Sequence, residues 1–333
     1  MWAEKGFEVA WDEFELPSLK AVRIITPAPP LSFSDDGRNI SVSSRGFIYV
    51  FSKASGMIES LKISGDEMIK SAPSLNLWRA PLANETDEWG YGWSGVSHQS
   101  PGFGNFAATE WYSTGLDRLK TIPTGLTVEK AGKDSVVINS GNVVVPAFGW
   151  GGFINRYRYV INGDGEIRIE HSIVPDGITP SWLPRIGLQW ILDSGLDRVT
   201  WYGRGPQENY PDRKSGYRTD IYSTTVGEMY EPYLIPQDYG LRTDNRWVRF
   251  INSKGTGLEF HGSGLFNFNA YPYETDNLTR ALYTYQLHKS GNITFNLDYA
   301  TSGVGCTALS VFPRYRVLPV VTFFATTIKP VFK

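Results

Sequence analysis

Residues Trp201–Arg213 read WYGRGPQENYPDR, and this segment constrains the fold more than any other stretch of the chain. Its aromatic beginning is typical of a strand end, and Gly203, Gly205 and Pro206 then predict a tight, rigid turn. Four charged side chains fall within the segment: Arg204, Glu208, Asp212 and Arg213. Because carboxylates near arginines usually form ion pairs, we expect these side chains to pin a structural loop.

Short apolar runs separated by turn residues lie on both sides of this segment. Residues 162–165, Asn-Gly-Asp-Gly, predict a hairpin turn. Apolar and polar residues alternate in 258–261 and 293–298, which predicts strands with one face buried and the other face in water. The strands predicted in this way are 39–42, 47–52, 57–63, 135–145, 153–161, 166–174, 247–252, 257–262, 266–270, 292–298 and 320–328.

The turn residues and the absence of helical periodicity predict the fold class. No window longer than about 12 residues has the apolar repeat of a helix, so helices should be few and short. The 34 glycines and 20 prolines supply many tight turns. We therefore predict an all-β fold, a large antiparallel β-supersandwich. Residues 87–104, which are rich in tryptophan and glycine, are predicted to form a long loop.

The composition excludes several classes of function. The formal net charge is −2 and no basic run is present, which argues against a nucleic-acid partner. The single cysteine, Cys306, allows no intrachain disulfide, and the four histidines lack metal-ligand spacing, so we expect no metal site. No stretch of about 18 uninterrupted apolar residues occurs, so no membrane span is predicted. The sequence does not indicate a cellular compartment.

Changes in composition along the chain predict that it is divided into three structural parts. Residues 1–17 carry apolar positions without a neighbouring strand in sequence, and they are interpreted as the last strand of a preceding domain. Residues 18–30 include Pro27, Pro29 and Pro30, which predicts a stiff linker. Residues 31–333 then form the β-supersandwich domain.

Segments in a fixed order resemble the C-terminal β-sandwich domain of the β-galactosidases of glycoside hydrolase family 2. Residues 205–213 contain a Gly-Pro-x-Glu-x-Tyr-x-Asp-Arg signature, and residues 76–84 contain an Arg-Ala-Pro-x-x-Asn segment. In the second segment Glu85 stands where the family often has Asp. Residues 1–17 resemble the closing strand of the immunoglobulin-like domain that precedes the last domain in these enzymes. The remaining similar segments are 183–187, 229–242, 287–288, 296–298 and 303–305.

The resemblance implies a galactose mutarotase-like supersandwich that packs beside a TIM barrel in the complete enzyme. The barrel would supply both catalytic glutamates and any Mg²⁺ or Na⁺ site, so no catalytic residue and no cofactor is expected in this chain. The chain would shape the substrate cleft of a retaining β-galactosidase and would be inactive alone. Its partners would be a β-galactoside or a related β-glycoside and the remaining domains of the parent, which could be a homo-oligomer.

The resemblance also gives the candidate residues of a carbohydrate pocket. Many members place a tryptophan after the Gly-x-Gly turn, but residues 305–310 read Gly-Cys-Thr-Ala-Leu-Ser, and Leu309 or Ser310 falls nearest that place. The loss of this stacking platform argues against lactose and favours another β-galactoside or a different β-glycoside. Arg79 and Asn84 are the other pocket candidates. Alternatively, Arg79 ties two loops together. The family's His-x-His is replaced by Tyr-Thr-Tyr at 283–285.

Arg185 lies inside an apolar stretch and should therefore pair with a carboxylate, because a lone buried guanidinium is costly. Glu208 or Asp212 is the predicted partner.

Two other classes of function remain open on the sequence alone. A mutarotase-like sugar isomerase would need a histidine facing a carboxylate, for which His171 or His261 with Glu208 are the candidates. A carbohydrate-binding module would need an exposed aromatic platform. The candidates for that platform are Trp89, Trp93 and Trp111.

Overall fold

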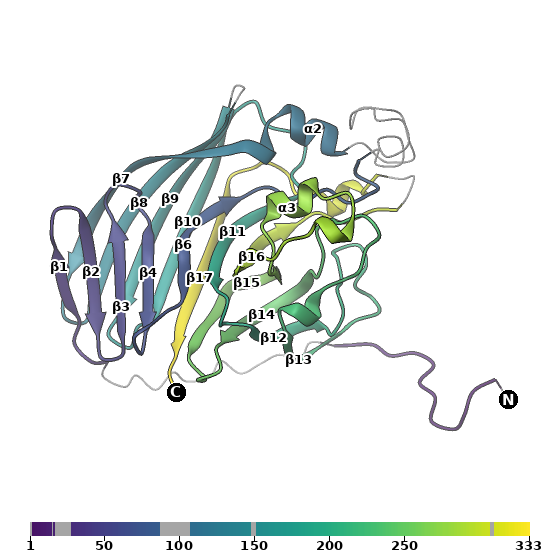
Figure 1. Ribbon diagram of the computed structural model, residues 1–333, viewed down its shortest axis with the longest axis horizontal. Coiled ribbons are helices and arrows are strands. Elements are labelled where there is room, and N and C mark those ends of the chain that lie inside the picture. The colour runs from purple at the N-terminus through teal and green to yellow at the C-terminus, as the bar shows by residue number, and fades with distance from the viewer. Residues whose placement is uncertain (1, 15, 17–27, 87–106, 148–150, 307–309) are drawn as a thin grey trace.

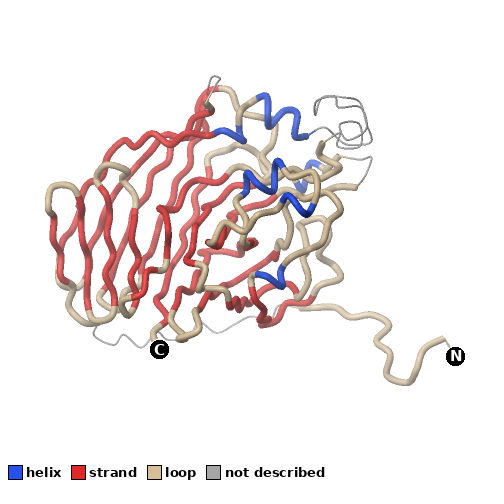
Figure 2. The backbone as a smooth tube through the Cα atoms, viewed as in Figure 1, coloured by secondary structure: helices blue, strands red, loops and turns tan. Residues whose placement is uncertain are grey.

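The computed structural model describes residues 2–14, 16, 28–86, 107–147, 151–306 and 310–333. These residues form two antiparallel sheets and little helix, as Figures 1 and 2 show. The prediction of an all-β antiparallel supersandwich is confirmed. The predicted loop 87–104 lies outside the described residues, as do residues 18–27 of the predicted linker and Leu309.

The smaller sheet is a five-stranded meander at the left of Figure 1. Its strands follow one another in sequence because short turns join them, as the glycine spacing predicts. The turn at Gly46 has a φ of 89°, a left-handed conformation that glycine adopts without strain. The strands are β1 (Ser32–Asp35), β2 (Asn39–Ser44), β3 (Phe47–Ser52), β4 (Ile58–Ile63) and β5 (Asp66–Glu67).

The larger sheet has twelve strands, and all its pairings are antiparallel. Its main path runs β13-β12-β14-β15-β17-β10-β9-β8-β7, while β11 pairs with β6 and β16 beside that path. The predicted strands 257–262 and 266–270 are one long strand, β15. The strands are β6 (Ile69–Asn76), β7 (Leu119–Ala131), β8 (Ser135–Pro146), β9 (Gly151–Asn162), β10 (Ile167–Gly177), β11 (Arg185–Asp193), β12 (Arg198–Gly205), β13 (Arg218–Thr225), β14 (Arg242–Ile251), β15 (Gly257–Tyr271), β16 (Asn292–Thr301) and β17 (Thr322–Val331).

Helices are short, as predicted. In the described part of the chain there are two α-helices, α2 (Ala107–Ser113) and α3 (Thr275–Arg280), at the upper right of Figure 1. Of the helices that the structure describes, none has the length and apolar character needed to cross a membrane. The 3₁₀ helices are η1 (Leu116–Arg118), η2 (Gly227–Met229), η3 (Thr284–Gln286) and η4 (Pro313–Tyr315).

The main hydrophobic core lies between the smaller sheet and the facing strands of the larger sheet. Ile40 and Phe51 of the smaller sheet are fully buried, as are Val136 and Tyr159 of the larger one. The rings of Phe51 and Tyr159 meet edge to face with centroids 5.1 Å apart. Burial of each such side chain contributes about 1.5–3 kcal/mol, so this interface accounts for much of the stability of the fold.

The burial predicted for strand residues 293–298 differs from their burial in the structure. The alternating residues 293–298 of β16 were expected to keep a polar face in water, but Thr294, Asn296 and Asp298 are buried as completely as the apolar residues between them. That prediction is wrong because this face of β16 is covered by other parts of the chain. By contrast, Glu259 and His261 on β15 are half-buried, in line with their alternating pattern.

The N-terminal segment lies against the edge strand β13. Within the described residues 2–14 no strand is formed. The Glu13 carboxylate accepts a hydrogen bond from the backbone N–H of Thr219 at 2.6 Å. Phe7 and Phe14 are exposed, with 58% and 82% of their surface in solvent. That this segment closes a preceding immunoglobulin-like domain stays a prediction.

Gly187 allows β11 and β16 to pack closely at a bulge between Ile186 and Gly187. A Cβ at Gly187 would lie 2.6 Å from the Asp298 Cα and would also clash with the Leu297 carbonyl oxygen. We predict that Gly187→Ala lowers the free energy of unfolding by about 1–3 kcal/mol, because the strands must move apart. Gly264→Ala is the control, because a Cβ there meets nothing within 4 Å. Urea unfolding gives both values, and equal midpoints would contradict the prediction.

Candidate functional site

Three segments that are far apart in sequence meet at one end of the larger sheet: residues 79–85, 208–213 and 302–306. We call their meeting point the junction. β6 and β16 both pair antiparallel with β11, so they run in the same direction and end at the same edge. Residues 79–85 follow β6 and residues 302–306 follow β16, which brings the two segments together.

The signature loop, residues 201–213, fixes the Gly-x-Gly turn, residues 303–305, through Asp212. The Asp212 carboxylate accepts hydrogen bonds from the backbone N–H of Val304 at 3.0 Å and of Gly305 at 2.8 Å. The Arg213 guanidinium donates to the Gly305 carbonyl oxygen at 2.6 Å. Hydrogen bonds to a charged group are about twice as strong as neutral ones, so these contacts define the position of the turn.

The segment after β6 holds the same turn from the other side. Asn84 donates from Nδ2 to the carbonyl oxygens of Val304 at 2.6 Å and Cys306 at 3.3 Å. Arg79 is fully buried and donates to the carbonyl oxygens of Ser302 and Gly303, at 3.3 and 3.2 Å. It therefore ties two segments together, which is the alternative role predicted for it, rather than facing a solvent-open pocket.

A carboxylate neutralises Arg79 at the position where the sequence departs from the family pattern. Glu85 is fully buried and forms an ion pair with Arg79. Burial opposes the charged guanidinium, but the attraction of Glu85 outweighs it and raises the pKa of Arg79. Glu85 thus supplies the negative charge that a buried arginine needs.

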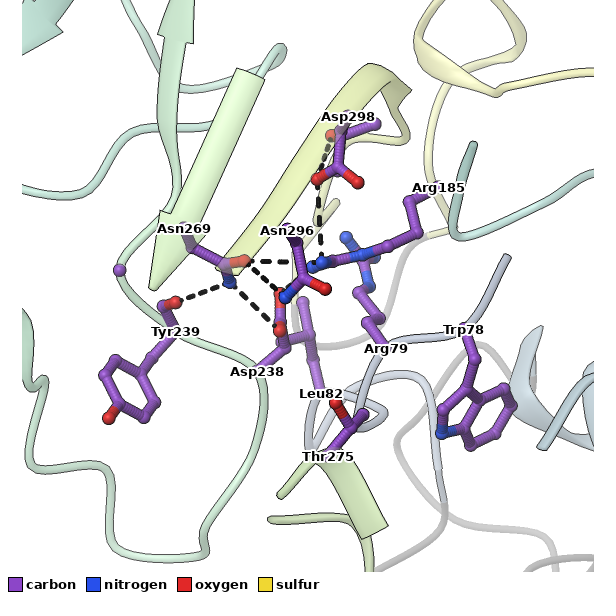
Figure 3. A network of polar contacts seen from close by, with 12 residues as sticks. Trp78, Arg79, Leu82, Arg185, Asp238, Tyr239, Asn269, Thr275, Asn296 and Asp298 are labelled. Atoms are coloured by element: carbon purple, nitrogen blue, oxygen red, sulfur yellow. Dashed lines mark hydrogen bonds and ion pairs between the residues drawn. The ribbon is translucent and has the colours of Figure 1, made fainter. Parts of the chain in front are cut away.

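A second buried network lies behind the junction and is drawn in Figure 3. Arg185 on β11 donates to the Asp238 carboxylate at 2.5 Å and to the Asn269 Oδ1 at 3.3 Å. Its other carboxylate partner is Asp298 on β16, with Nη1 and Oδ2 3.5 Å apart. The predicted pairing of Arg185 with Glu208 or Asp212 is therefore wrong, although a carboxylate partner was correctly expected.

Asparagines extend this network between strands, as Figure 3 shows. Asn269 on β15 donates to the Asp238 carboxylate at 3.1 Å and to the Tyr239 carbonyl oxygen at 2.8 Å. Asn296 on β16 donates to the Asn269 Oδ1 at 2.9 Å and accepts from Asn76 at 2.9 Å. These residues were not predicted from the sequence. The alternation of apolar and polar residues in 293–298 could have indicated Asn296 alone, and its polar face is buried rather than in water.

Glu208 and Arg204 join the signature loop to other neighbours. The Glu208 carboxylate accepts from the Gly240 N–H at 2.8 Å and also from the hydroxyls of Tyr210 and Tyr233. Arg204 donates to the Asp244 carboxylate at 2.7 Å. The charged side chains thus hold the loop, as expected, but not through ion pairs with one another. Apart from Tyr210, the partners named here lie outside the loop.

The histidines do not form an isomerase pair with Glu208. His171 is fully buried between Tyr299, whose hydroxyl lies 2.8 Å from Nδ1, and Asn155, whose Oδ1 lies 2.9 Å from Nε2. Burial lowers the pKa of His171 to about 3, so its imidazole is neutral at physiological pH. His261 contacts Glu259 at 2.5 Å. Neither ring contacts Glu208, whose oxygens bond to Gly240 and to the two tyrosine hydroxyls.

The remaining candidate residues for sugar binding are three tryptophans and Ser310. Trp111 is fully buried and donates from Nε1 to the Trp182 carbonyl oxygen at 2.9 Å, so its predicted exposure is wrong. Trp89 and Trp93 lie outside the described residues. Ser310 is exposed and accepts from the Arg316 guanidinium at 3.2 Å. Within the described ranges, no three His, Cys, Asp or Glu side chains are grouped as a metal site would require.

Asp298 makes the stability of the network depend on pH. Burial raises its pKa from 3.8 to about 6, against the opposing charge of Arg185. Between these two values the folded chain holds a proton that the unfolded chain has released, so this group lowers the stability as pH rises from about 4 to about 6. We predict that Asp298→Asn becomes more stable relative to the natural chain across this interval. Urea unfolding at several pH values measures the difference, and a difference independent of pH would contradict the assignment.

Comparisons with known proteins identify the family of the chain. The profile of the family described as Beta galactosidase small chain matches residues 43–328. The β-galactosidase of Priestia megaterium is 29% identical over 306 residues, which is 91% of this chain and 27% of that protein. The β-galactosidase of Kluyveromyces lactis is 28% identical over 327 residues, which is 94% of this chain and 29% of that protein.

Solved structures of sugar epimerases are remotely similar. The galactose 1-epimerase of Lactobacillus acidophilus has a TM-score of 0.44 at 11% identity and covers 91% of this chain and 99% of that one. A putative aldose 1-epimerase of Escherichia coli has a TM-score of 0.42 at 8% identity and covers 91% of this chain and 100% of that one. At this distance the description of the fold rests on the strand pairing.

Because the family profile covers most of the sequence, the chain belongs to the β-galactosidase small-chain family. The predicted resemblance is thereby confirmed. The chain spans less than a third of the length of these curated relatives, 27% of the Priestia megaterium protein and 29% of the Kluyveromyces lactis protein.

Proposed function

We propose that this chain is the C-terminal accessory domain of a retaining β-galactosidase and that it completes one wall of the sugar site. The observation that carries the proposal is the junction, where the Gly-x-Gly turn is held from both sides by Asp212, Arg213, Asn84 and Arg79. The segment that follows this turn, residues 307–310, is the one that the family resemblance assigns to the wall. A rigid turn would fix the point at which that segment begins, as substrate positioning requires.

The chain alone would be inactive. Retaining hydrolysis needs a carboxylate nucleophile and a carboxylic acid about 5–5.5 Å apart on either side of the glycosidic bond. In the junction, Glu85 pairs with Arg79, whereas Glu208 and Asp212 accept from backbone N–H groups and, for Glu208, from tyrosine hydroxyls. Asp238 and Asp298 are fully buried around Arg185. The nucleophile, the acid and any Mg²⁺ or Na⁺ would therefore belong to the remaining domains, which are the proposed partners of this chain.

The substrate of the assembled enzyme would be a β-galactoside or a related β-glycoside. The Gly-x-Gly turn is not followed by tryptophan, so the wall offers no indole for stacking against a sugar. This favours a substrate other than lactose. A panel of chromogenic and natural β-glycosides would rank the candidates.

A mixing experiment tests the accessory role. The purified chain is combined with the polypeptide that carries the remaining domains of the parent enzyme, and hydrolysis of a chromogenic β-galactoside is followed. We expect activity in the mixture and none in either part. Full activity of the remaining domains without this chain would refute the proposal, because the wall would then be dispensable.

A further inference from the structure

A cavity of about 410 Å³ opens beside the junction, and none of the four side chains that hold the Gly-x-Gly turn lines it. It is bounded by the segment after β6, by η1, by residues 235–236 and by α3 with the residues that follow it. Its volume lies within the range of small-molecule sites, about 300–1,000 Å³. We propose that this cavity binds a sugar unit, which is a neutral ligand with several hydroxyl groups.

Two residues that line the cavity, Thr86 and Asp117, each carry a buried polar atom that has no hydrogen-bond partner within the part of the chain that the structure describes. Thr86 is only 3% exposed, and its Oγ1 is one of these atoms. The Oδ1 of Asp117 is the other, while the Oδ2 of the same carboxylate lies 3.2 Å from the Arg118 Nε. Buried polar groups are nearly always bonded, so two unbonded atoms on residues that line the same cavity favour a missing partner.

The two atoms also restrict the chemistry of that partner. A carboxylate oxygen such as Asp117 Oδ1 only accepts hydrogen bonds, so the ligand must donate. A threonine hydroxyl can either donate or accept. The hydroxyl groups of a sugar suit both atoms, because each hydroxyl can donate and can accept a hydrogen bond.

Aromatic rings in the same wall suit the apolar faces of a pyranose. Trp78 and Tyr112 line the cavity and meet edge to face with their centroids 5.1 Å apart. The Trp78 indole donates from Nε1 to the Thr279 Oγ1 at 3.2 Å, which fixes the orientation of the ring. The wall therefore combines a few polar groups with rigid aromatic surface, as sites for small ligands do.

The charges in the wall argue against an anion and against a metal ion. The cavity is lined by two carboxylates, Asp117 and Asp276, and one guanidinium, Arg280. Arg280 already pairs with Asp276 at 2.7 Å, so it is not a free cation for a phosphate or carboxylate. Two carboxylates on opposite elements, without a third ligand of the His, Cys, Asp or Glu type among the described residues, do not make a metal site.

Calorimetric titration of the purified chain tests the proposal, with D-galactose and lactose as probes and with sodium phosphate and MgCl₂ as alternatives. We expect saturable binding of at least one sugar. Thr86→Val and Asp117→Asn should each weaken it about tenfold, a loss of about 1.4 kcal/mol. Asp220→Asn is the control, because this carboxylate is exposed on β13 and does not line the cavity.

The variants also separate ligand binding from a structural role. Thr86→Val removes a hydroxyl that has no partner among the described residues, so the urea midpoint of the variant should not fall. Absence of saturable sugar binding, binding that both variants leave unchanged, or binding of phosphate or Mg²⁺ instead would overturn the proposal. The titration needs no turnover and no other domain, so its outcome is independent of the proposed accessory role.

Discussion

Replacing Arg185 with methionine is expected to lower the free energy of unfolding by about 3–5 kcal/mol. Arg185 is fully buried, and its two carboxylate partners, Asp238 and Asp298, are fully buried as well. Without the guanidinium both carboxylates would lose the cation that pairs with them in the network of Figure 3. An unpaired buried charge is far more costly than the pair itself is stabilising, so the loss should exceed that of most single substitutions.

Urea unfolding measures this loss, with Arg168→Met as the matched control. Arg168 pairs with Glu170 on the surface at 3.1 Å, and such exposed pairs contribute less than about 1 kcal/mol. The triple variant Arg185→Met, Asp238→Asn, Asp298→Asn should regain part of the stability, because its buried groups are neutral. A loss at Arg185 no larger than that at Arg168 would contradict the role assigned to the network.

Gly303→Ala is expected to lower kcat/KM of the assembled enzyme about 100-fold, because a displacement of about 1 Å near a reacting centre has effects of that size. A Cβ at Gly303 would lie 2.5 Å from the Asp212 carboxyl carbon. The carboxylate would be pushed away from the N–H groups of Val304 and Gly305, and the turn would lose its anchor. The wall segment that follows would then be misplaced.

The assay is hydrolysis of a chromogenic β-galactoside by the chain mixed with the remaining domains of the proposed parent enzyme. Gly216→Ala is the control, because Gly216 lies just after the signature loop and a Cβ there meets nothing within 4 Å. Asp212→Asn should resemble Gly303→Ala, because an amide lacks the charge that strengthens these bonds. If Gly303→Ala retained the activity of Gly216→Ala, the turn would not position the wall.

Many strands with an apolar face were predicted from the sequence, whereas the edge strands β1, β7 and β13 were not, and the buried strands β6 and β11 were also absent from the predicted runs. β3 coincides with the predicted run 47–52, because Phe47, Tyr49 and Phe51 face the core between the sheets. β7 was missed because most of its residues are exposed and Pro123 and Gly125 interrupt it. β13 was missed for the same reason, since at the sheet edge it has no fully buried residue and its one isoleucine, Ile221, is exposed.

The polar interior was the least predictable part of the site. A charged residue such as Arg185 in an apolar stretch indicates a buried ion pair, but not which carboxylate completes it. The partner Asp238 lies 53 residues away in sequence, while the signature loop, which is richer in charge, supplies none. The family signature identified the loop that holds the turn, because its Asp212 and Arg213 bond directly to residues 304–305. The hydrogen bonds from this loop to residues 304–305 could be found only in the folded chain.

Bond cleavage is assigned to domains outside this chain, and one measurement tests that claim most directly. The purified chain is incubated alone with a chromogenic β-galactoside, and the rate of release of the chromophore is compared with a protein-free blank. We expect a rate equal to the blank. A rate well above it that disappears in Glu208→Gln or Asp212→Asn would contradict the assignment, because these carboxylates would then be catalytic rather than structural.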